Sequence, residues 1–197
     1  MKFTAHTDTG LRRTNNEDRY HAEPGLFVIA DGMGGHRSGA EAAQRAVDAF
    51  VAAIHAGKPG DEAARAANEA VLAIEGGRSS CSPGSTLTAI VITENRALLV
   101  HAGDSEAWRI GLFGVEKLTE DHGTSWGLEN FCGIGEEFRV DIAEVPALPG
   151  DRFVLASDGL SKHVMQCEID GKTAEDLVDL ANERGGKDNT TVIVIDI

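Results

Sequence analysis

Short apolar runs separated by polar and glycine-rich turns recur along most of the chain, a pattern typical of proteins rich in β-strands. The clearest run is LFVIA at residues 26–30, and its unbroken apolar character predicts a strand buried on both faces. Residues 139–145 alternate between apolar and polar side chains and predict an edge strand, whereas residues 121–137 show no period and predict a loop. The other predicted strands span residues 86–93, 97–101, 107–110, 115–118, 152–157 and 190–195.

Three stretches show helical periodicity instead. Residues 39–56 carry an apolar stripe at helical spacing after Ser38, a suitable N-cap. Residues 61–74 predict an alanine-rich helix that Gly76 and Gly77 would end, and residues 173–183 predict an amphipathic helix. Two early helices, a strand-rich middle and one late helix favour a layered α+β sandwich over a series of βαβ units. The stripe of the first helix consists of Ala43, Val47, Phe50, Val51 and Ile54.

The size and charge of the chain limit its organisation and partners. Its 197 residues fit one domain, expected to span residues 1–197. The 32 acidic residues against 18 basic ones give a net charge of −14, which would repel nucleic acid and anionic membranes, so we expect neither as a partner. No apolar run approaches the ~18–20 residues of a membrane-spanning helix. We expect a monomer.

The cysteines and the N-terminus indicate a reducing compartment. The three cysteines are widely spaced and form no Cys-x-x-Cys pair, so neither a disulfide framework nor a zinc cage is expected. The first residues hold no apolar segment of the kind found in secretory signals. We therefore expect a cytoplasmic protein. The cysteines are Cys81, Cys132 and Cys167.

Carboxylates flank the strongest predicted strands. Asp31 and Asp158 each come directly after a strand and before a glycine, and Asp188 stands just before the last strand. Glu17 and Asp18 form an adjacent pair near the N-terminus. Taken singly, an Asp-Gly after a strand is usually a turn, and an acidic pair is usually solvated. Their recurrence favours a shared site, because buried carboxylates need a cation and oxygen ligands suit Mg²⁺ or Mn²⁺.

Seven motifs stand in order along nearly the whole chain. They are GLRRTNNED (residues 10–18), ADGMGGH (30–36), GSTL (84–87), AGDS (102–105), LTEDH (118–122), ASDGL (156–160) and DNTT (188–191). This set resembles the bacterial branch of the metal-dependent protein phosphatases of type 2C. The resemblance implies a four-layer αββα sandwich, in which helices flank two antiparallel sheets. It also implies hydrolysis of phosphoserine and phosphothreonine in proteins, at a centre of two Mn²⁺ or Mg²⁺ ions with a third, weaker ion beside it.

The resemblance further implies which residues hold the ions. Asp31 would bridge two metals, with the carbonyl of Gly32 as a further ligand. Asp158 and Asp188 would hold the first metal. Asp121 would share the third metal with Asp158.

Glu17 and Asp18 would act on the other side of the centre, largely through bound waters. Two neighbouring ions lower the pKa of a bound water, which would attack phosphorus in line. Arg13 would bind the substrate phosphate, since a guanidinium fork suits phosphate oxygens and offsets charge on the phosphoryl group. The leaving oxygen needs a proton, from either a metal-bound water or His36.

The sequence departs from the family's pattern at two places. Residues 123–137 form a short, glycine-rich segment where relatives usually carry a longer flap, so we expect a more open site. Glu106 follows Gly-Asp-Ser where many relatives have arginine, which changes the local charge. Residues 84–86 and 103–105 are expected to set turns or to support the site.

Other phosphatase chemistries lack their signatures here. No Cys-x5-Arg, Asp-x-Asp or P-loop pattern occurs, and Met33 interrupts the Asp-x-Gly-x-Gly loop of histidine-kinase-like ATPases. The alternative that stays open is a catalytically weak, metal-binding pseudophosphatase that regulates or scaffolds a partner. For an active enzyme, the expected substrates are proteins phosphorylated by a bacterial serine/threonine kinase.

Overall fold

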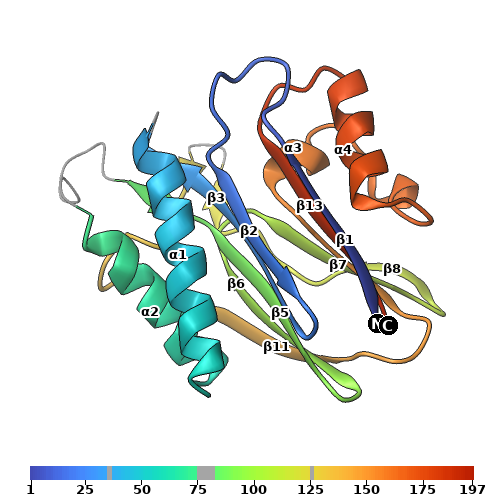
Figure 1. Cartoon of the computed structure of the whole chain (residues 1–197), viewed down its shortest axis with the longest axis horizontal. Coiled ribbons are helices and arrows are strands. Elements are labelled where there is room, and N and C mark those ends of the chain that lie inside the picture. The colour runs from blue at the N-terminus through green and yellow to red at the C-terminus, as the bar shows by residue number, and fades with distance from the viewer. Residues whose placement is uncertain (35–36, 75–82, 125–126) are drawn as a thin grey trace.

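Two antiparallel β-sheets lie face to face in the middle of the molecule, and helices cover both outer faces (Figure 1). The structure is a computed structural model that describes residues 1–34, 37–74, 83–124 and 127–197. One apolar layer separates the two sheets. A second layer lies between the first sheet and its helices, and a third lies between the second sheet and its helices. The predicted four-layer αββα sandwich is therefore confirmed.

The first sheet has the strand order β11-β6-β5-β3-β2, with the short β4 paired to the end of β3. As predicted, β11 lies at an edge and pairs only with β6 in this order. The strands are β2 (Asp18–Glu23), β3 (Leu26–Met33), β4 (Gly84–Ser85), β5 (Leu87–Thr93), β6 (Arg96–Ala102) and β11 (Asp141–Pro146).

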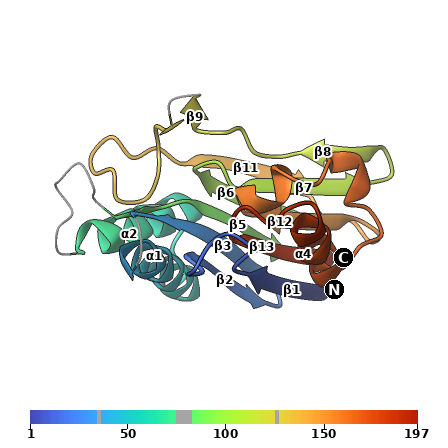
Figure 2. The ribbon, with the colours of Figure 1, turned by 90° about the horizontal axis from the view of Figure 1, so that it is seen from above.

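The second sheet has the order β1-β13-β12-β7-β8. Its first two strands bring the two ends of the chain together, as both views show (Figures 1 and 2). A separate two-stranded ladder, β9 (Gly123–Thr124) with β10 (Gly127–Leu128), lies in the segment after β8. The strands of the second sheet are β1 (Lys2–Asp8), β7 (Glu106–Gly111), β8 (Gly114–Lys117), β12 (Arg152–Ala156) and β13 (Thr190–Asp196).

Helices α1 and α2 pack over the first sheet, and α3 and α4 pack over the second (Figure 1). A capping box begins α4: Thr173 Oγ1 accepts from the Asp176 N–H, and the Asp176 carboxylate accepts from the Thr173 N–H. In the described ranges, no helix is both long and apolar enough to cross a bilayer. The helices are α1 (Arg37–His55), α2 (Gly60–Leu72), α3 (Asp158–Ser161), the 3₁₀ helix η1 (Gln166–Glu168) and α4 (Ala174–Glu183).

The structure shows why residues 26–30 of strand β3 are apolar at every position. Successive side chains of a strand point to opposite faces of the sheet. Phe27 and Ile29 point between the sheets, where they pack in one cluster with Phe153. Val28 and Ala30 point the other way, into the layer beneath α1 and α2. Both faces of β3 are covered, as the sequence predicts.

Three boundaries differ from the sequence-based expectations. Strand β3 continues past Asp31 to Met33, because its last residues pair with β4. Helix α1 begins at Arg37, so Ser38 lies in its first turn and is not its cap. The segment 121–137 holds the short strands β9 and β10 where only a loop was expected. The glycines expected to end the second helix, Gly76 and Gly77, lie outside the described residues.

The layer between the sheets can be tested at Phe153, which is fully buried. We expect Phe153→Ala to lower the free energy of unfolding by about 3–5 kcal/mol, because apolar contacts are lost and a cavity forms. Phe113 is 101% exposed in the turn between β7 and β8, so Phe113→Ala is the matched control, with an expected change below about 0.5 kcal/mol. Urea unfolding followed by circular dichroism measures both values, and equal values would contradict this layer.

Candidate metal centre

A cavity of about 470 Å³ lies where the end of β3, the end of β12 and the start of β13 converge. Its walls come from distant parts of the chain: the loop after β1, the β6–β7 turn, the first turn of α3 and the loop before β13. Carboxylates dominate its charged lining. The charged residues that line it are Arg13, Glu17, Asp31, Asp104, Asp158, Lys162 and Asp188.

Asp18 lies beneath this cavity and joins the two sheets. It opposes Asp31 in the β2–β3 register and is only 2% exposed. Its Oδ2 accepts hydrogen bonds from Ser157 Oγ and Thr191 Oγ1, each at 2.7 Å. Thr191 lies in β13 and Ser157 directly follows β12, two neighbouring strands of the second sheet. Asp18 Oδ1 is buried and has no hydrogen-bond partner among the described residues. Burial raises the pKa of Asp18 to about 6, although the two hydroxyl groups oppose this shift.

Asp31 is fixed by its backbone and surrounded by negative charge. Its N–H donates to Thr86 Oγ1 at 2.8 Å, and its carbonyl accepts from the Thr86 N–H at 2.9 Å. Thr86 Oγ1 in turn lies 2.8 Å from Ser105 Oγ, so the motifs at residues 84–87 and 102–105 do support the site. Burial raises the pKa of Asp31 well above its ordinary value, and the charges of Asp18 and Asp158 raise it further.

Two glycines allow α1 to approach β3 closely beside the carboxylates. A Cβ atom on Gly32 would lie 2.1 Å from the Gly39 carbonyl oxygen, and a Cβ on Gly39 would lie 2.4 Å from Glu17 Oε2. Any larger residue would therefore push the helix, the strand or the Glu17 side chain out of place. The glycine at position 32 is thus required by packing, whether or not its carbonyl binds a metal.

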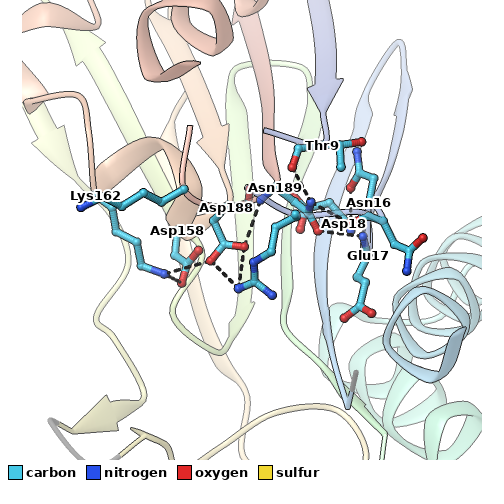
Figure 3. Close-up of polar contacts among 12 residues, drawn as sticks. Thr9, Asn16, Glu17, Asp18, Asp158, Lys162, Asp188 and Asn189 are labelled. Atoms are coloured by element: carbon cyan, nitrogen blue, oxygen red, sulfur yellow. Dashed lines mark hydrogen bonds and ion pairs between the residues drawn. The ribbon is translucent and has the colours of Figure 1, made fainter. Parts of the chain in front are cut away.

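Asp158, the first residue of α3, lies beside Asp188 of the loop before β13 (Figure 3). Asp158 Oδ1 is buried without a hydrogen-bond partner in the described part of the chain, while Oδ2 accepts from Lys162 Nζ at 2.5 Å. Asp188 Oδ2 lies 3.4 Å from the same Nζ. Asp188 also pairs with Arg13, whose Nη2 lies 2.9 Å from each carboxylate oxygen.

Asn189 ties the loop after β1 to this carboxylate pair (Figure 3). Its Oδ1 accepts from the Glu17 N–H at 2.8 Å, and its Nδ2 donates to the carbonyls of Thr9 and Asn15 at 2.9 Å each. The DNTT motif therefore contributes more than Asp188, because the next side chain positions the segment that carries Arg13. The sequence analysis gave Asn189 no role.

Two charged residues of the cavity were not predicted as part of the site. Asp104 lies in the β6–β7 turn, and burial together with the charge of Asp158 raises its pKa. Lys162 lies one helical turn after Asp158. Asp104 could have been predicted from its place in the AGDS motif, at the end of a buried strand. The sequence analysis gave that motif only a turn or a supporting role.

Two of the predicted side chains that the structure describes, those of Asp18 and Asp121, do not line the cavity. Asp121 pairs at 2.9 Å with Lys117, and its side chain is 53% exposed. Lys117 also pairs with Glu106 at 2.6 Å, so the unusual glutamate of the Gly-Asp-Ser-Glu sequence is held by a lysine. His36 lies outside the described residues. The roles of Asp121 in a third ion and of His36 as a proton donor stay predictions.

The donor set fits hard divalent cations. The cavity is lined by five carboxylates, whose oxygens are the ligand type that such cations prefer. Asp18 and Asp158 each have a buried oxygen without a hydrogen-bond partner among the described residues. Buried carboxylates repel one another and favour a cation between them. Within the described ranges, no group of three or more acidic, histidine or cysteine side chains is arranged, as these side chains stand, so that it could hold a metal ion. Arg13 and Lys162 hold two of the carboxylates instead.

Comparison with known proteins identifies the same family over nearly the whole chain. A sequence model described as Protein phosphatase 2C matches residues 4–185. The serine/threonine protein phosphatase PstP of Mycobacterium tuberculosis is 34% identical over 232 residues, which cover 100% of this chain and 45% of PstP. The chain thus spans less than half the length of that relative. Protein phosphatase PhpP of Streptococcus pneumoniae is 31% identical and is covered over 97% of its length, with 99% of this chain aligned.

Solved structures show the same fold. The crystal structure of M. tuberculosis PstP has a TM-score of 0.86 and 31% identity, with 100% of this chain and 98% of that chain covered. The PstP catalytic domain in complex with two manganese ions has a TM-score of 0.83 and 32% identity, with 99% and 97% covered. Together with the match over residues 4–185, these likenesses show that the chain belongs to the protein phosphatase 2C family.

Proposed function

We propose that this chain is a metal-dependent protein phosphatase that hydrolyses phosphoserine and phosphothreonine, with residues 1–197 acting as one catalytic domain. The observation that carries this proposal is the convergence of acidic side chains from both sheets on one cavity with an arginine beside them. Relatives named as serine/threonine phosphatases support it, and one solved relative holds two manganese ions. The relatives are named as phosphatases and give no support to the pseudophosphatase alternative.

The carboxylates are proposed to hold Mn²⁺ or Mg²⁺. Asp31, the Gly32 carbonyl, Asp158 and Asp188 would hold these ions. Glu17 and Asp18 would contribute from the opposite side, and Asp121 would serve a third ion. When bound, the ions supply an activated water as nucleophile and offset phosphoryl charge. The hydroxyl groups of Ser157 and Thr191 keep Asp18 in one orientation, because both donate to the same oxygen.

Arg13 is proposed to bind the substrate phosphate. Its side chain is 53% exposed at the cavity, and it contacts Asp188 through a single nitrogen, Nη2. A guanidinium has five N–H donors in a rigid fork, so the same side chain can hold a carboxylate and phosphate oxygens together. Asn189 fixes the loop that carries it. The substrates would be phosphoproteins modified by a bacterial serine/threonine kinase, and the monomeric state stays a prediction.

Removing one carboxylate of the proposed metal centre should abolish catalysis. We expect Asp31→Asn and Asp158→Asn each to lower Mn²⁺-dependent kcat on a phosphothreonine peptide at least about 100-fold, since the ions supply the nucleophile and much of the charge stabilisation. Asp48→Asn is the matched control, because Asp48 lies exposed on α1 and bonds to Gln44. Circular dichroism checks that the fold is retained. Near-normal turnover in both site variants would contradict the proposed centre.

Loss of the arginine should affect substrate use. We expect Arg13→Ala to lower kcat/KM for the phosphopeptide by about 10- to 100-fold, because a charge-assisted bidentate contact to phosphate is lost. Arg12→Ala is the control, since the neighbouring exposed Arg12 does not line the cavity. Steady-state kinetics at saturating Mn²⁺ measures both variants. Equal kcat/KM values for Arg13→Ala and the unchanged protein would remove Arg13 from this role.

The raised pKa of Asp18 predicts a pH-dependent stability difference in the metal-free protein. A pKa that is higher in the folded state contributes stability at low pH, and this contribution is lost as the pH rises from about 4 to about 6. The unfolding free energy of the unchanged protein, minus that of Asp18→Asn, should therefore fall by about 2–3 kcal/mol between pH 4 and pH 7.

The prediction concerns a difference between variants because His101 has the opposite dependence. Burial lowers the pKa of His101 to about 4, so its contribution grows as the pH rises over the same range. His101 is present in both proteins and cancels. Urea unfolding in EDTA at several pH values measures the difference, with Asp48→Asn again as the control. A difference that stays constant with pH would show that Asp18 is not destabilised by its burial.

A further inference from the structure

Lys162 stands out among the cavity residues because it contacts two carboxylates that the proposed function gives to a metal. It is the C-cap residue of the short helix α3. Its Nζ donates to Asp158 Oδ2 at 2.5 Å and lies 3.4 Å from Asp188 Oδ2 (Figure 3). Asp104, a third carboxylate, lines the same cavity.

The surroundings of Lys162 differ from those of an ordinary surface ion pair. The side chains of Asp158 and Asp188 are only 19% exposed, whereas the lysine side chain is 50% exposed. Lys58 provides the comparison, because it pairs with one carboxylate, Glu62, which is itself 51% exposed. A pair of that kind contributes little to stability. The ammonium of Lys162 instead sits against partly desolvated carboxylates, where its charge has a larger effect.

We propose that Lys162 is a tethered cation that competes with divalent metal ions for Asp158 and Asp188. The inference rests on the ligand roles given to these two residues under the proposed function. In the metal-free protein, the ammonium offsets repulsion between carboxylates that would otherwise face each other without a counter-charge. A divalent ion bound to the same oxygens would repel the ammonium. The half-exposed lysine stem can then turn toward solvent.

Competition of this kind has two measurable consequences. Removing the charge at position 162 should tighten metal binding, because the ion no longer displaces a cation from its ligands. The same change should lower the stability of the metal-free protein, because the carboxylates lose their counter-charge. A lysine that only braced helix α3 would affect stability and leave metal affinity unchanged, so the two readings are distinguishable.

The test is calorimetric titration of the metal-stripped full chain with MnCl₂. We expect Lys162→Gln and Lys162→Met to bind Mn²⁺ about three- to tenfold more tightly than the unchanged protein, and Lys162→Arg, which keeps the charge, to stay within about twofold. Lys58→Gln is the matched control and should leave the affinity unchanged. Thermal unfolding in EDTA should give lower Tm values for the Gln and Met variants only. Two different neutral replacements keep the test independent of the behaviour of either one.

Unchanged or weaker Mn²⁺ binding by both neutral variants would overturn the inference while leaving the metal centre itself intact. Failure of the unchanged protein to bind Mn²⁺ at all would instead overturn the proposed ligand set, and the inference with it. Tighter binding by the neutral variants, with normal affinity in Lys58→Gln and Lys162→Arg, would support the competition.

Discussion

Repulsion between buried carboxylates is the constraint on which this site depends. Asp18 and Asp31 oppose each other on neighbouring strands of one sheet, while Asp158 and Asp188 approach from the other sheet. The apolar layers between and around the sheets hold the strands that carry them, so the carboxylates cannot separate without disturbing the fold. Hydroxyl donors and basic side chains reduce this repulsion locally, and a divalent cation bound between the carboxylates would reduce it further.

The fold enforces the approach through contacts that are individually simple. Ser157 and Thr191 reach across to Asp18 and tie the two sheets at the cavity. Thr86 fixes the backbone of Asp31 from a neighbouring strand. Asn189 holds the loop that brings in Glu17. None of these side chains carries a charge, and their common role is to keep charged groups close together where water alone would let them move apart.

The sequence predicted those parts of the structure that depend on local pattern. Asp31 could be found because it follows an apolar run and precedes a glycine, and both features are visible without the fold. Strands β1 and β2 received no prediction, because both are edge strands whose residues are largely polar or half-buried and alternate only weakly. The roles of Lys162 and Asn189 were also missed. Their contacts join segments that only the folded chain brings together, and no spacing rule gives a lysine or asparagine such a position.

Asp188 links the two basic residues of the cavity. Arg13 and Lys162 both contact its carboxylate, so an ion that binds there meets two cations at once. Lys162 is also held by Asp158, whereas Arg13 lies on a loop anchored by Asn189 and has further donors in its guanidinium. An incoming divalent ion therefore has different effects on the two. The ion repels Lys162, which is bound only through its single ammonium group. Arg13 stays at the cavity, where a phosphate would enter, because its loop holds it there.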